Sequence, residues 1–220
     1  MTGNSETQAD IEALAGRLTD ARAQIRGESA TALIRAADAG QNIAAAVPAL
    51  GSTLDDGNLG VRKEAIWALY CAARAGVDLG VALAPLEACL DDENRSVRGN
   101  AAIGVARHYL NAGRVDDATA LVEREPFGAA WALADHCCKT GDKDPLKAVV
   151  RTIEGGLLPR SQGIRRGIAT AIDNAAGRDP DGALAVQAIQ EVLDENPDDP
   201  IWFAKISGIF MALNQLRRRS

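Results

Sequence analysis

The hydrophobic positions of this chain repeat with a period of 36 residues. Ile11, Leu14 and Leu18 lie at i, i+3 and i+7, the spacing of one apolar face of an amphipathic helix. The same spacing returns one period later at Val47, Leu50 and Leu54, and again at Leu83, Leu86 and Leu90. Each of these segments ends in an acidic turn and is followed by a second helical pattern. The sequence therefore predicts a repeated helix pair.

The second helix of each pair has its own signature. It opens with Ile25-Arg26, Val61-Arg62 or Val97-Arg98, after acidic turns at Thr19-Asp20, Asp55-Asp56 and Asp91-Asp92. Small residues three and six places after the arginine would let neighbouring helices approach closely, and a branched residue follows at the seventh place. Gly40, Gly76 and Gly113 come at the ends, where a left-handed C-cap favours glycine.

Less regular copies continue the pattern to the end of the sequence. They begin at Glu125, Ile164 and Pro200, and Asp144-Pro145 predicts an N-cap carboxylate before a helix-opening proline. We expect an all-α fold of about six helix pairs, stacked as a right-handed α-α superhelix with a concave groove, because one pair cannot bury its apolar face alone. Residues 1–9 are expected to be disordered, and residues 10–220 to form a single repeat domain.

The acidic turn followed by V-R-x-x-A-x-x-A-L resembles the HEAT repeat and its short phycobilisome-lyase-type variant. The resemblance is strongest over residues 11–113 and weaker later, where Pro126 and Ile201 replace the arginine. It implies that the turn aspartate and the helix arginine, here Asp56 with Arg62 and Asp92 with Arg98, tie successive repeats together. The sequence shows no nucleophile–base pair, glycine-rich phosphate loop or metal-ligand spacing, so we expect a non-enzymatic scaffold or adaptor that holds another protein or a peptide segment in its groove.

In such an array the outward positions of the second helices should carry the binding site. Trp67, Ile103 and Trp131 each lie five places after the arginine position, and they predict an apolar stripe across three repeats. The charged residues beside this stripe are Arg35, Arg74, Arg107 and Asp135. Tryptophan and arginine are common anchors of protein interfaces. In the alternative interpretation, the two tryptophans belong to the core between repeats.

A second resemblance points to an enzyme. DNA alkylation repair glycosylases of the HEAT-like class have a tryptophan and an aspartate one helical turn apart, a later Arg-Arg pair and a terminal Lys-x-x-Gly-Trp segment. Trp131, Asp135 and Arg166 match the first two features, whereas Ile209 stands where the final tryptophan is expected. The resemblance implies base stacking by Trp131 and charge stabilisation by Asp135.

Composition and charge narrow the possible functions. The 220 residues carry a formal charge of −6, which argues against a general nucleic-acid binder, and no apolar run is long enough to span a membrane. His108 and His136, near Cys137 and Cys138, lack the converging geometry that zinc needs, so neither a metal nor a cofactor is expected. The four cysteines show no CxxC spacing, and we expect reduced thiols in a cytoplasmic protein. The sequence does not predict an oligomeric state.

Overall fold

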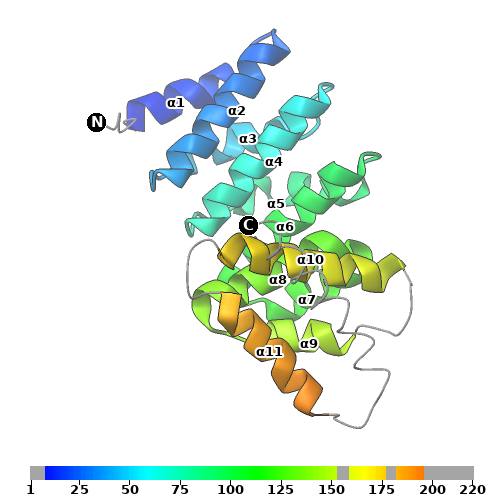
Figure 1. Ribbon diagram of the computed structural model, residues 1–220. Coiled ribbons are helices and arrows are strands. Elements are labelled where there is room, and N and C mark those ends of the chain that lie inside the picture. The colour runs from blue at the N-terminus through cyan, green and yellow to red at the C-terminus, as the bar shows by residue number, and fades with distance from the viewer. Residues whose placement is uncertain (1–7, 153–158, 177–181, 196–220) are drawn as a thin grey trace. The chain divides into compact units, whose positions relative to one another are not determined.

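The computed structural model describes residues 8–152, 159–176 and 182–195, and this part of the chain is helical and contains no strand (Figure 1). It divides into two compact units, Met1–Asn111 and Ala112–Ser220. The first unit contains α1 (Gln8–Arg17), α2 (Ala23–Asp38), α3 (Val47–Ser52), α4 (Leu59–Arg74), α5 (Gly80–Ala88) and α6 (Arg95–Asn111), with short 3-10 turns at Ala44–Ala46 and Cys89–Asp91. The second contains α7 (Val115–Arg124), α8 (Pro126–Thr140), α9 (Asp144–Arg151), α10 (Pro159–Ala176) and α11 (Gly182–Asp194).

These helices confirm the predicted pairing. Five pairs run from α1/α2 to α9/α10. Helix α11 matches the first helix of the predicted sixth pair, and the segment predicted to form its second helix lies outside the described residues. The fold class is therefore an all-α, HEAT-like helical repeat. The right-handed superhelix of the complete chain and its organisation as one domain stay predictions. Because α1 begins at Gln8, the first helix starts two residues earlier than expected.

The first unit is built from three helix pairs in regular order. Its second helices, α2, α4 and α6, lie side by side, each against the next (Figure 1). The residues seven places after each arginine, Leu33, Leu69 and Val105, are fully buried between them. The predicted apolar faces of the first helices are buried too, except that Leu83 is only half-buried and Ala82 takes the core position on α5.

Helix ends follow local chemistry. Gly40, Gly76, Gly113 and Gly141 have φ between 72° and 84°, the left-handed conformation predicted for helix stops. At the start of α4, Asn58 Oδ1 accepts hydrogen bonds from the backbone N–H groups of Gly60 and Val61. The prediction of Asp144 as an N-cap is wrong by one residue, because Lys143 holds the N-cap position and Asp144 is already helical.

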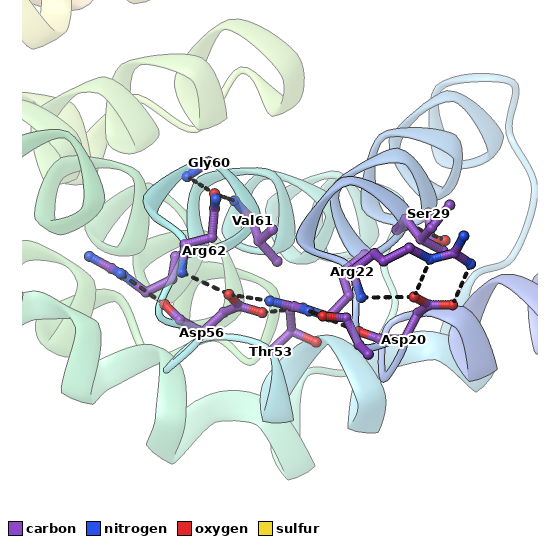
Figure 2. A network of polar contacts seen from close by, with 12 residues as sticks. Asp20, Arg22, Ser29, Thr53, Asp56, Gly60, Val61 and Arg62 are labelled. Carbon is purple, nitrogen blue, oxygen red and sulfur yellow. Dashed lines mark hydrogen bonds and ion pairs between the residues drawn. The ribbon is translucent and has the colours of Figure 1, made fainter.

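An arginine–aspartate ladder joins the repeats of the first unit. Arg26 at the start of α2 donates to both carboxylate oxygens of Asp56 in the next turn, with Nε–Oδ2 at 2.5 Å and Nη2–Oδ1 at 2.9 Å. One repeat later, Arg62 Nε lies 3.1 Å from Asp92 Oδ2. Its Nη1 donates to the carbonyl of Asp56 at 2.8 Å (Figure 2). Arg26 and Arg62 thus each hold their own turn and the following one together, which confirms that these residues join successive repeats. The carboxylate pairs differ from the implied ones, because Asp56 pairs with Arg26 and Asp92 with Arg62, whereas Arg62 and Arg98 donate to the backbone carbonyls of Asp56 and Asp92. The guanidinium of Arg26 also lowers the pKa of Asp56.

The second unit is organised around the close packing of α8 and α10. A Cβ on Gly167 would lie 2.3 Å from the carbonyl oxygen of Phe127 and 2.9 Å from the backbone nitrogen of Trp131. A Cβ on Gly163, one turn earlier, would lie 2.9 Å from Pro126. These two glycines are required because the backbones of the two helices nearly touch. Ion pairs also connect α9 to α11, because Lys143 at the N-cap of α9 and Lys147 within it both pair with Glu191 of α11.

Candidate functional site

The outward side chains of α2 and α4 form the best-defined candidate surface. We call it the α2–α4 face and define it by Thr31, Arg35, Asp38, Glu64, Trp67 and Arg74. All six are at least partly exposed. The 36-residue repeat places equivalent turns of the two helices side by side, so residues one period apart face each other. This face includes three of the residues that the sequence predicted for partner binding.

Polar contacts between the two helices fix this surface. Thr31 Oγ1, in the middle of α2, lies 3.4 Å from Glu64 Oε2 on α4. At the C-terminal ends of the two helices, Arg74 forms an ion pair with Asp38, the residue one full period before it. Asp38 remains half-exposed in that pair. The face therefore presents both charge signs, with Trp67 between the two polar contacts.

Trp67 is held by the aromatic ring of a neighbouring residue. Its ring centroid lies 4.9 Å from that of Tyr70 at a tilt of 43°, and the guanidinium of Arg74 lies 5.8 Å from the Tyr70 ring. Tyr70 itself is buried. The indole is half-buried and keeps part of its surface in solvent. A large aromatic side chain that is pre-positioned in this way loses little conformational entropy when a partner covers it.

Two predicted residues of the third repeat do not extend this surface. Ile103 and Arg107 on α6 are each only 4% exposed. Tyr109 on the same helix is also buried, and its hydroxyl donates a hydrogen bond to Glu87. The expected apolar stripe is therefore not continuous, because the outward positions of α6 are covered in the folded chain. Side chains covered in this way offer no surface to a partner.

The residues predicted in the second unit are placed differently from expectation. Trp131 is 6% exposed and lies on α8 where α10 crosses at Gly167, so its indole belongs to the core. Asp135, one turn later, is largely buried and its carboxylate pairs with Lys139 at 2.8 Å. The alternative in which this tryptophan packs inside the protein is the one that the structure supports.

The same positions bear on the resemblance to glycosylases. A base-stacking tryptophan needs an open ring face, whereas the side chain of Trp131 is buried. Arg166 points its guanidinium over the ring of Phe127 at 5.6 Å. The Lys205–Gly208 segment lies outside the described residues. In the part of this constellation that the structure describes, nothing favours lesion recognition.

The histidines and cysteines form no reactive constellation. His108 Nδ1 lies 3.8 Å from a carboxylate oxygen of Asp78, and His136 Nε2 lies 3.6 Å from one of Asp142. Burial raises the pKa of the Cys137 thiol to about 12, which keeps it protonated and unreactive at neutral pH. None of the four cysteines is in a disulfide, and all four are buried. Within the described ranges, no group of three or more metal-ligating side chains is arranged to hold an ion.

Sequence reasoning missed Asp38 on the α2–α4 face and Tyr70, the buried ring that packs against Trp67. Both residues have a recognisable signal, since Tyr70 lies three residues after Trp67 and Asp38 lies one period before Arg74. Residues one period apart on stacked helices are expected to meet, and opposite charges at such positions predict an ion pair. The period that defines the fold could thus also have identified this contact.

Comparison with known proteins supports the repeat class. The family model described as HEAT repeats matches residues 11–107, which cover almost all of the first unit. This segment is therefore a run of HEAT repeats, a class of α-solenoid whose members generally bind proteins. The match is to HEAT repeats in general and adds nothing on the lyase-type variant or on glycosylases.

Solved structures of engineered proteins are also similar to the chain. One crystal structure of an engineered protein from the Northeast Structural Genomics Consortium is 21% identical, over 94% of this chain and 97% of its own, with a TM-score of 0.48. A second from the same consortium is 22% identical over 95% and 99% of the two chains, with a TM-score of 0.49. No curated protein sequence matches significantly. Among the helices that the structure describes, none has the length and apolar character to cross a bilayer.

Proposed function

We propose that this protein is a binding module that holds a segment of another protein on the α2–α4 face. The observation that carries the proposal is Trp67. Of the two tryptophans in the described residues, it is the one whose ring reaches solvent, whereas Trp131 is buried. Exposed tryptophans flanked by arginines are common anchors of protein interfaces. Arg35 and Arg74 provide such flanks here.

The charge arrangement of the face favours an extended, mixed-charge partner. The ion pair of Arg74 with Asp38 bridges the seam between α4 and α2, and the exposed Arg35 lies on α2, three residues before Asp38. A segment that runs across α2 and α4 would meet both charge signs and one aromatic ring. We expect the array to present this face on its concave side. We also expect a cytoplasmic location, in keeping with four cysteines that form no disulfide.

The experiment compares the wild type with Trp67→Ala in capture from an extract of the native host, quantified by mass spectrometry. We expect at least one protein to be captured by the wild type and depleted at least about fivefold by the variant, since hot-spot truncations commonly cost 1 kcal/mol or more. Leu59→Ala is the matched control, because Leu59 is 37% exposed on the same helix but outside the face. Equal loss in both variants, or no loss in Trp67→Ala, would refute the proposal.

A further inference from the structure

The first unit also has a cleft, which lies mainly on other helices than the α2–α4 face. This cleft of about 690 Å³ opens between α3 and α5, where these helices run into the turns that precede α4 and α6. We call it the turn-edge cleft. It is lined by residues of the two first helices and of the two acidic turns, together with Arg62 of α4, whereas every residue of the α2–α4 face lies on a second helix. Its volume lies within the range of clefts that bind ligands.

The floor of the cleft is apolar. Leu54 and Cys89 are 3% and 7% exposed and form its deepest part, with Gly51, Pro85 and Ala88 around them. The Cys89 thiol lies 3.9 Å from the carbonyl of Leu54. Burial raises the pKa of this thiol to about 11, in agreement with a poorly hydrated floor. An aliphatic side chain that entered the cleft would therefore leave water for an apolar surface.

The rim of the cleft is acidic beyond what the fold requires. The ladder uses one aspartate in each turn, Asp56 and Asp92, and these accept from Arg26 and Arg62. Asp55 and Glu93 are additional exposed acids that the ladder does not use. One period before Asp55 the chain has Thr19, and one period before Glu93 it has Gly57. The extra carboxylates are thus specific to the rim of this cleft.

The one basic residue of the lining does not cancel this charge. Arg62 donates to Asp92 and to the carbonyl of Asp56, so its guanidinium is already engaged within the ladder. The rim therefore keeps an excess of negative charge above an apolar floor. Exposed carboxylates attract a cationic partner and lose that attraction as ionic strength rises.

We propose that the turn-edge cleft binds a protein segment in which an arginine or lysine stands beside an aliphatic side chain. The aliphatic group lies against Leu54, Ala88 and Cys89, and the cationic group reaches the rim carboxylates. This site is independent of the α2–α4 face, since the two surfaces share no residue. A binding module with both sites would hold two segments, or two parts of one partner.

The test uses fluorescein-labelled peptides and anisotropy with the full chain. One peptide alternates arginine with leucine, a second replaces leucine with serine, and a third replaces arginine with glutamate. We expect binding of the first alone, and an affinity that falls as salt increases. The double variant Asp55→Asn/Glu93→Gln should weaken it about three- to tenfold, the sum of two exposed charge contacts. Glu12→Gln/Glu28→Gln is the charge-matched control and should leave the affinity unchanged.

A variant whose cleft is filled by a larger side chain provides a second test of peptide binding. Ala88 is exposed, so Ala88→Trp should fold normally and abolish binding by occupying the floor, whereas Ala84→Trp on the same helix lies outside the cleft and should bind as the wild type does. Trp67→Ala should also bind the peptide normally, which separates this site from the α2–α4 face. Equal binding of the serine peptide would show attraction to the rim without use of the cleft and would overturn the proposal. So would unchanged binding by Ala88→Trp, or no binding by the wild type.

Discussion

Asp20 forms its ion pair with Arg22 of its own turn, whereas the later aspartates of the ladder pair with an arginine of the preceding repeat. Its Nε and Nη2 donate to the two carboxylate oxygens of Asp20 at 3.1 and 3.2 Å (Figure 2). Asp56 and Asp92 obtain the same kind of partner from Arg26 and Arg62. At the positions equivalent to Arg22 the chain has Asn58 and Asn94, whose side chains accept from the backbone at the starts of α4 and α6. In the first repeat, the residue at the N-cap position therefore forms an ion pair within its own turn and does not cap the helix with its side chain.

This ion pair predicts a pH-dependent contribution of Asp20. Hydrogen bonds from Arg22 lower its pKa from 3.8 to about 2 in the folded protein. A lowered pKa means that the charged form stabilises the fold above the unfolded value and that this stability is lost as pH falls toward 2. Asp20→Asn should therefore lower the melting temperature at pH 5 to 7, and the difference from the wild type should shrink between pH 4 and 2.5. A difference that stays constant over this range would contradict the assignment, and Glu12→Gln on the exposed face of α1 provides the charge control.

The period of the sequence was enough to predict the pairing of the helices, the buried faces and the glycine stops. Each of these depends on local spacing, which a repeat displays three times. It was not enough to predict which outward positions stay exposed. Ile103 and Trp131 occupy the same repeat position as Trp67, but they are covered while Trp67 is not. Exposure at an equivalent position depends on what packs over each helix, and that information is not contained in the repeat itself.

The crossing of α8 and α10 could not be predicted from the repeat either. Gly163 and Gly167 allow it, and a prediction follows from the distances. Gly167→Ala should destabilise the protein by about 1–3 kcal/mol, because the added methyl group meets backbone atoms that cannot move aside. Gly27→Ala, also within a helix, has its nearest contact at 3.8 Å and should stabilise by up to about 1 kcal/mol. Denaturant unfolding of both variants measures this difference, and equal effects in the two would show that the crossing is looser than described.

The register of the first helices is tested by their buried leucines. Leu50 and Leu86 are fully buried at equivalent repeat positions, and replacing either with alanine should cost about 2–5 kcal/mol. Val81 on α5 is 72% exposed, so Val81→Ala should change stability by less than about 0.5 kcal/mol. Chemical denaturation compares the three variants directly. A cost below about 1 kcal/mol for both leucines would mean that the helices face the other way.

The two tryptophans provide the sharpest comparison between core and surface. Trp131 packs inside the second unit, so Trp131→Ala should cost about 3–5 kcal/mol and lower the melting temperature strongly. Trp67 is half-buried on the α2–α4 face, so Trp67→Ala should cost less, since part of its ring already lies in water. The smaller cost leaves the fold intact, which is what makes the partner-capture experiment interpretable. Circular dichroism melts of the two single variants measure both costs. If Trp67→Ala were as destabilising as Trp131→Ala, the indole would be a core residue, and loss of binding in that variant would reflect unfolding instead of a lost anchor.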